Sequence, residues 1–386
     1  MCAVVLLSPA LAAAQNRPAP NWVRAVEWSP SGDRIAFATQ RGTVRILDST
    51  TGELVIELQG RGPDAVFALA WSPDGTQLAA GGQSNATKIW DAATGQVVRE
   101  LRTRLGGVIS LDWSPDSAKI ATVSQSEFPG TNVWDLATGE LFQPHIGEAQ
   151  SAAWSPDGTL LAAAMIGDLQ LWDVETQQKV GSIEIPGYAI DLAWSHDGTK
   201  IASADTYTPT SSRVRLWNVA TGELLQEFEG HTDVINSASW NPAEDRLASS
   251  SSDGTVRVWD VASGRVLTLY RSTNRVFGAT FSPYGGRLAF GGTLPEAGTP
   301  FIVDAAVAVY ADGAVQIVVP APSVEQLHAI VAACDAPPAV ETSLIASLDA
   351  GDLEDVVAQV EALPPDTIPP ACAADVIAVA EALQGA

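Results

Sequence analysis

Positive charge is scarce in this chain of 386 residues. It contains 21 Lys and Arg against 45 Asp and Glu, a formal net charge of -24. No Lys or Arg follows Arg287, whereas acidic residues continue to Glu381. Because a surface field of this sign repels phosphate backbones and anionic lipid head groups, we expect no nucleic-acid partner.

Long apolar runs are also missing. Residues 3–14 are apolar and end in small residues, which is the h-region and A-x-A pattern of a secretory signal. The run is shorter than the roughly 20 apolar residues that cross a bilayer, and no other stretch qualifies, so we expect no membrane span. We predict a signal peptide at residues 1–14 and an exported protein, periplasmic or extracellular. A hydrophobic N-terminal strand or core segment is the alternative.

Catalytic motifs are lacking too. The four histidines do not cluster, and there is no phosphate-binding G-x-x-x-x-G-K-[ST] loop, H-E-x-x-H helix or G-x-S-x-G elbow. Turn residues Asp74, Asp157 and Asp197 raise the question of calcium, but each turn offers one carboxylate where Ca²⁺ needs several oxygens. We therefore expect no enzyme activity, no metal and no cofactor.

The chain does contain a repeat. An aromatic residue recurs 40 to 46 residues apart, at Trp28, Trp71, Trp113, Trp154, Trp194, Trp240 and Phe281. Each aromatic opens a turn, most clearly in Trp71-Ser72-Pro73-Asp74-Gly75, where Pro presets φ and Gly allows the chain to reverse. The runs between turns are short and β-favouring, and they predict four strands per repeat.

A second signature follows each aromatic by about 19 residues, as in Ile89-Trp90-Asp91 and Val258-Trp259-Asp260, and a Thr-Gly or Ser-Gly turn comes next. With these three signatures the chain resembles the WD-repeat β-propeller family over residues 22–320. The resemblance implies an all-β fold, a seven-bladed β-propeller of four-stranded antiparallel blades. In the seventh repeat Val303-Asp304 replaces Trp-Asp, and we expect residues 314–319 to complete the last blade.

Residues 321–386 form a different unit, acidic and of helical periodicity. Apolar residues recur at helical spacing in Leu327–Cys334 and in Leu353–Val360, and a last helix is expected at about residues 371–383. Gly351 can end one helix before Asp352 caps the next. Because Cys334 and Cys372 lie on apolar helix faces and an exported protein is oxidised, we predict a disulfide between them, with two buried thiols as the alternative.

One residue set is assigned by the resemblance. It implies that His231, Asp253 and Trp259 hydrogen-bond within the sixth repeat, with Ser249 or Ser251 supplying a hydroxyl. This would be a structural network that holds one blade together.

Binding residues are sought where the repeats differ. The Ser-Pro-Asp-Gly and Thr-Gly turns share one face of the ring and are nearly uniform, whereas the connections on the opposite face vary. Arg and aromatic residues are common at interface hot spots. The candidates on the variable connections are Arg61, Arg104, Phe128, His145, Tyr188, Tyr207 and Arg275. Scattered solvent-exposed loop residues remain the plainer interpretation of each.

Two functions follow from this sequence. The first is a non-enzymatic scaffold that binds a protein or peptide partner on the variable face. The alternative is a ligand-sensing or hydrolytic propeller with a small molecule in its central channel. Unpaired carboxylates at the channel mouth would favour the second, and an aromatic, Arg-rich rim would favour the first.

Overall fold

The structure is a computed structural model in which part of the chain is described. The described residues are 22–58, 64–102, 106–125, 130–146, 149–206, 212–271, 275–292, 301–304, 331, 337–364, 367–368, 372–373, 376–377 and 380. The predicted signal peptide lies outside them.

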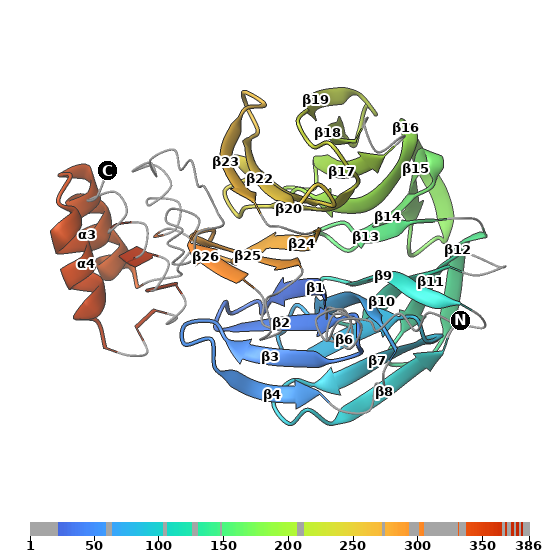
Figure 1. Ribbon diagram of the computed structural model, residues 1–386, viewed down its shortest axis with the longest axis horizontal. Helices are drawn as coiled ribbons and strands as arrows, with labels where there is room; N and C mark the ends of the chain where they lie inside the picture. The colour runs from blue at the N-terminus through green and yellow to red at the C-terminus, as the bar shows by residue number, and fades with distance from the viewer. Residues whose placement is uncertain are drawn as a thin grey trace, which may run out of the picture.

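Seven strands surround a central axis (Figure 1). They are β1 (Val23–Trp28), β5 (Val66–Trp71), β9 (Gly107–Trp113), β13 (Ser151–Trp154), β16 (Gln178–Trp194), β20 (Ile235–Trp240) and β24 (Val276–Phe281). Successive inner strands lie side by side, and β24 returns beside β1, which closes the ring. Every inner strand ends at a repeated aromatic residue, as the repeat predicted.

The second strand of each repeat is buried on both faces because sheets pack on either side of it. These strands are β2 (Arg34–Thr39), β6 (Gln77–Gly82), β10 (Lys119–Gln125), β14 (Leu160–Ala164), β17 (Lys200–Thr206), β21 (Arg246–Ser251) and β25 (Arg287–Gly292). Their small residues let neighbouring sheets approach closely. A Cβ at Gly81, for example, would lie 2.4 Å from Val108 Cγ1 on the next sheet.

The third and outer strands extend each sheet away from the axis. The third strands are β3 (Val44–Asp48), β7 (Ala86–Asp91), β11 (Gly130–Asp135), β15 (Ile166–Asp173), β18 (Arg213–Asn218), β22 (Thr255–Asp260) and β26 (Phe301–Asp304). The outer strands are β4 (Leu54–Leu58), β8 (Val97–Arg102), β12 (Leu141–Ile146), β19 (Leu224–Phe228) and β23 (Val266–Arg271). All neighbouring strands pair antiparallel.

The sheets are not seven equal blades. Four have four strands each, β1–β4, β5–β8, β9–β12 and β20–β23. One has seven strands because β16 continues through Pro186-Gly187 and pairs with both β15 and β17. The sheet β24–β26 has three strands among the described residues, and residues 314–319 lie outside them. The prediction of seven four-stranded blades is therefore wrong in its count: four blades have that form.

Tryptophans at the ends of the inner strands join neighbouring sheets. Trp113 Nε1 donates to the Ala70 carbonyl at 3.1 Å, and Trp240 Nε1 donates to the Ala193 carbonyl at 3.1 Å. Both acceptors lie one residue before the aromatic of the preceding inner strand. The indole thus buries its rings between two sheets and satisfies its N–H on the neighbour.

Turn carboxylates are satisfied locally. Asp74 Oδ1 accepts hydrogen bonds from the Ser72 hydroxyl at 2.6 Å and the Thr76 amide at 3.0 Å. In the Trp-Asp turns, Asp91 Oδ1 likewise accepts from the amide and hydroxyl of Thr94. Chain reversal therefore accounts for these recurring aspartates.

The Thr-Gly turns also contact the neighbouring sheet. Gly95 has φ +70°, and a Cβ there would lie 2.5 Å from Ile56 Cδ1 on β4. Gly139 has the same backbone conformation, φ +73°, but open space around its missing Cβ. Conformation demands glycine at both turns, and packing demands it only at the first.

Side chains tie the last sheet to the first. Trp28 Nε1 donates to the Thr280 carbonyl at 3.2 Å. The buried Arg287 donates from Nη1 to the Ser49 carbonyl at 2.9 Å, and its Cζ lies 4.8 Å from the centre of the Trp28 ring. These contacts connect parts of the chain that are about 240 to 250 residues apart.

The helices α3 (Pro338–Asp349) and α4 (Leu353–Glu361) follow the ring in sequence and lie on the β26 side of the molecule (Figure 1). The helical prediction is confirmed here, and Asp352 caps α4 by accepting from the Asp355 amide at 3.0 Å. Their core includes the buried Cys372, and the ring residue Tyr284 packs against it. Neither α3 nor α4 has the length and apolar character that would let it span a membrane.

Cys372 takes part in a disulfide, and Cys334 lies outside the described residues. Their pairing therefore stays a prediction. The same holds for the helix ends predicted at residues 327–334 and 371–383, of which the structure describes only part.

Candidate functional site

Two of the predicted binding residues can be placed fully. Tyr188 lies on β16 and lines the central cavity, and Arg275 is exposed immediately before β24. His145 lies on β12, where its backbone pairs with Thr131, and nothing is described of its side chain. The other four candidates lie outside the described residues: Arg61, Arg104, Phe128 and Tyr207.

A β-bulge interrupts six of the inner strands at the same position, four residues before the repeated aromatic. In β1, for example, Val23 pairs with Thr39 and Ala25 pairs with Ala38, which leaves Arg24 unpaired. A bulge adds one residue to a strand and redirects its side chain. The bulge residues are Arg24, Phe67, Ile109, Ile190, Asn236 and Phe277. All six line the central cavity near the face where the inner strands begin.

This end of the cavity belongs to the variable face, which we define as the face that carries the connections into each inner strand. At this end of the cavity, Arg24 lies at the centre of a cluster of aromatic side chains. The Arg24 Cζ lies 4.3 Å from the Phe277 ring centre and 5.2 Å from the Phe67 ring centre, while Trp22 stacks on Phe277 at 5.8 Å. Burial, together with the nearby Arg275, lowers the pKa of Arg24. Three of the six bulges, at Arg24, Phe67 and Phe277, thus assemble a collar of aromatic and cationic side chains at the mouth, which we call the bulge collar.

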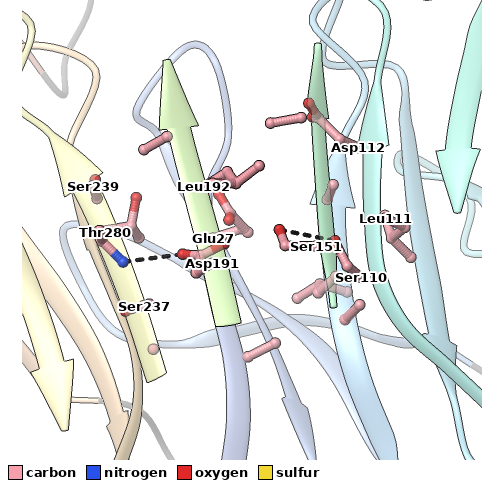
Figure 2. A pocket seen from close by; sticks show the side chains of 18 of the residues that line it. Glu27, Ser110, Leu111, Asp112, Ser151, Asp191, Leu192, Ser237, Ser239 and Thr280 are labelled. Carbon is pink, nitrogen blue, oxygen red and sulfur yellow. Dashed lines mark hydrogen bonds between the residues drawn. The ribbon is translucent and has the colours of Figure 1, made fainter. Parts of the chain in front are cut away.

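The cavity itself follows the axis and has a volume of about 920 Å³. Figure 2 shows three carboxylates, Glu27, Asp112 and Asp191, among its lining residues. Asp112 Oδ2 accepts from the Trp154 amide at 2.8 Å, and Asp191 Oδ2 accepts from the Ala238 amide at 3.0 Å. Each of these two side chains is therefore held by the backbone of a neighbouring inner strand.

These carboxyl groups retain protons to unusually high pH. Burial, and then repulsion from Asp112 and Asp191, raises the pKa of Glu27 to about 8. Burial raises the pKa of Asp112 and that of Asp191 to about 6. Glu27 lies deep inside the ring but faces the open channel, so its side chain is only half-buried. The channel is thus an acidic environment that holds protons or would attract positive charge.

Sequence reasoning missed both parts of this site, the bulge residues at the mouth and the carboxylates in the channel. Glu27 and Asp112 directly precede Trp28 and Trp113, where other repeats have Ala, Ser or Thr, and that difference was the available signal. In the channel the hydroxyls of Ser110 and Ser151 lie 3.5 Å apart, and Ser151 also hydrogen-bonds Asp191. Among the described residues, no three His, Cys, Asp or Glu side chains group so that they could hold a metal ion.

The residues assigned to the blade network do lie together. His231 Nδ1 is 2.9 Å from Asp253 Oδ2, and His231 Nε2 is 2.8 Å from Ser249 Oγ. Trp259 Nε1 donates to the same hydroxyl at 2.8 Å. Burial lowers the pKa of His231, and hydrogen bonds from His231 and Thr255 hold the pKa of Asp253 below its usual range despite burial. The effect of this network on stability stays a prediction.

Three family profiles match parts of the chain. The family described as "WD domain, G-beta repeat" matches residues 222–260. "Eukaryotic translation initiation factor eIF2A" matches residues 97–232, and "Anaphase-promoting complex subunit 4 WD40 domain" matches residues 13–65 and 59–116.

Individual known proteins are also similar to this chain, over longer stretches. WD repeat-containing protein SL1-17 of Schistosoma mansoni is 33% identical over 42% of this chain and 53% of its own length. Periodic tryptophan protein 2 of Arabidopsis thaliana is 28% identical over 46% of this chain and 20% of its own. Cell division cycle 20.6, cofactor of APC complex, from the same plant is 23% identical over 45% of this chain and 43% of its own. The matched region spans about half or less of these relatives.

The comparisons correct one prediction. Relatives such as the APC cofactor and periodic tryptophan protein 2 are intracellular, so the prediction of an exported protein, periplasmic or extracellular, is wrong. A short apolar run ending in alanines resembles a secretory signal by composition alone, and that resemblance misled the interpretation. The oxidising compartment no longer supports the predicted pairing of Cys334 with Cys372.

The repeated aromatic and Trp-Asp turns, the radial antiparallel sheets and the matches to WD-repeat proteins agree with one another. Together they support a WD-repeat β-propeller family for this chain.

Proposed function

We propose that this protein is a non-enzymatic interaction platform that binds a protein or peptide partner on its variable face. The bulge collar is the observation that carries the proposal. It gathers Arg24, Phe67 and Phe277 at the channel mouth, and arginine and aromatic side chains are those that dominate binding energy at interfaces. Tyr188 also lines the cavity, two residues before the bulge residue Ile190.

The names of two relatives support this proposal. One is a cofactor of the APC complex and another is THO complex subunit 3, so each is described by the assembly to which it contributes. We further propose that the ring has seven radial units, one for each inner strand, with β16 serving as the outer strand of one unit and the inner strand of the next.

The test compares the two faces of the ring. Tagged wild-type protein and the variant Tyr188→Ala/Arg275→Ala are used as bait in cell lysate, and captured proteins are quantified by mass spectrometry. The matched control is Glu53→Ala/Glu140→Ala, two exposed residues beside Thr-Gly turns on the opposite face. We expect the first variant to lose partners that wild type and control retain, at equal melting temperatures. The reverse pattern at equal melting temperatures would place the binding face on the uniform turns.

A second candidate is favoured by the three channel carboxylates. A cavity of about 920 Å³ is large enough for a small molecule, and its charge suits an organic cation. Spermidine should then raise the melting temperature of wild type but not of Asp112→Asn, measured at pH 8 where Asp112 and Asp191 are ionised. Equal shifts in both proteins would reject the channel as the binding site.

A further inference from the structure

Four arginines lie in a radial strip on the variable face, from the channel mouth outward over the sheet β20–β23. Arg24 is at the mouth, and Arg275 precedes β24 nearby. Arg271 is the last residue of β23, so Arg271 and Arg275 flank one connection, residues 272–274. Arg257 lies on β22 two residues from Thr255, which pairs with Arg271.

The arginines repel one another in two pairs, Arg24 with Arg275 and Arg257 with Arg271. None of the four lies within 4.0 Å of a carboxylate oxygen of a described residue. Burial and then the nearby Arg275 lower the pKa of Arg24. Burial lowers the pKa of Arg257, the nearby carboxylate of Asp253 opposes this, and Arg271 adds a smaller lowering effect. Elsewhere in the described structure arginines do find partners, as in the Arg215 contact with Asp205 at 2.9 Å. Gathered positive charge is therefore a local exception in a chain of net charge -24.

Two of the four side chains, Arg257 and Arg24, are held in place by packing. The Arg257 Cζ lies 5.7 Å from the Trp259 ring centre, and Arg257 Nε is buried without a hydrogen-bond partner among the described residues. Gly230 makes room for the guanidinium, because a Cβ there would lie 2.5 Å from Arg257 Nη1. Arg24 is likewise fixed between two aromatic rings. Side chains fixed before binding lose little entropy when a ligand arrives.

We propose that this strip, Arg24, Arg257, Arg271 and Arg275, binds an acidic peptide segment of the partner, which lies across the sheet β20–β23 and ends at the channel mouth. The proposal rests on the proposed function and names the chemistry of its partner. Carboxylates of the segment satisfy the guanidinium donors and remove their mutual repulsion. Apolar residues at the end of the segment contact Phe67 and Phe277.

A nucleic acid is the other polyanion that a row of arginines could bind. A long, evenly charged strand must cross the rest of a surface whose charge is strongly negative, whereas a short acidic segment contacts the strip alone. Charge complementarity thus favours the peptide, and the experiment includes a nucleic acid as a competing probe.

The experiment uses the full chain and a fluorescein-labelled oligoglutamate peptide, with binding followed by fluorescence anisotropy. The test variant is Arg271→Glu/Arg275→Glu, which reverses two exposed charges. The matched control is Arg99→Glu/Arg265→Glu, two exposed arginines off the strip, one of which lies at the opposite end of β23. Both variants change net charge equally, and melting temperatures verify folding. A single-stranded oligonucleotide of equal charge is titrated in parallel.

We expect wild type and control to bind the peptide with similar affinity, falling as salt rises, and the test variant to bind at least about tenfold more weakly. Absence of peptide binding to wild type, or equal weakening in test variant and control, would overturn the proposal. Tighter, strip-dependent binding of the oligonucleotide would replace the peptide by a nucleic acid. If the peptide result is negative while Tyr188→Ala/Arg275→Ala still loses captured partners, only the acidic partner is rejected, and the platform function stands.

Discussion

Replacing Glu27 by glutamine should make the protein more stable in neutral and mildly alkaline solution. Burial and the neighbouring Asp112 and Asp191 raise the pKa of Glu27 from 4.5 to about 8. Below pH 4.5 the carboxyl is protonated in both folded and unfolded protein and contributes nothing to pH dependence. Between about pH 4.5 and 8 the unfolded chain releases the proton more readily, so the stability of the folded state falls as pH rises.

The magnitude follows from the size of the shift. A full shift from 4.5 to about 8 corresponds to about 5 kcal/mol. Water in the channel screens a half-buried carboxyl, so we expect roughly 2 kcal/mol in practice. The turn aspartates act in another range, because hydrogen bonds lower the pKa of groups such as Asp197 below 3.8 and their stabilising effect is lost only in acid.

Urea unfolding from pH 5 to pH 8.5 measures this effect. We expect Glu27→Gln to match wild type near pH 5 and to exceed it at pH 8.5. Its exposed counterpart Glu140→Gln should follow wild type throughout. A constant difference between Glu27→Gln and wild type at every pH would refute the reasoning, because packing rather than ionisation would then be responsible.

Three further changes test the packing of the ring. Asp253→Ala removes the acceptor of His231 and should lower the free energy of unfolding by about 1–3 kcal/mol; an unchanged melting temperature would argue against the network. Gly95→Ala should destabilise more than Gly139→Ala, since both suffer about 1 kcal/mol of backbone strain but only the first meets a neighbouring sheet; equal losses would contradict that contact. Arg287→Met should cost about 1–3 kcal/mol and expose β1 and β24 first in hydrogen exchange, and uniform exchange around the ring would count against its closing role.

Much of the fold could be predicted because its causes are local. Trp71 and the turn that follows it specify the end of one strand and the start of the next, and Asp352 marks a helix start through its own side chain. Tyr188 was singled out from its connection, and the structure places it in the lining of the cavity, while its role in binding stays a prediction.

The rest depends on contacts between distant segments. Strict alternation along β1 does not reveal the bulge at Arg24, which arises from pairing with β2. Glu27 and Asp112 come near each other only when the ring closes. The sequence of either repeat alone therefore does not predict that the two carboxylates interact. The blade count failed at Pro186-Gly187, where a dipeptide that usually breaks strands lies within one.

The uninterrupted β16 has a consequence for how the chain can be cut or extended. Between most sheets a connecting loop separates one repeat from the next, and such loops are where new termini and inserted domains are tolerated. Within the seven-stranded sheet no such loop separates the repeat before Pro186-Gly187 from the repeat after it, since residue 184 still pairs with β15 and residue 188 already pairs with β17. In an array of repeats, opening can normally stop at a boundary. Here fraying that starts in β13–β15 passes along a shared backbone into β17–β19, so the seven strands form one cooperative unit.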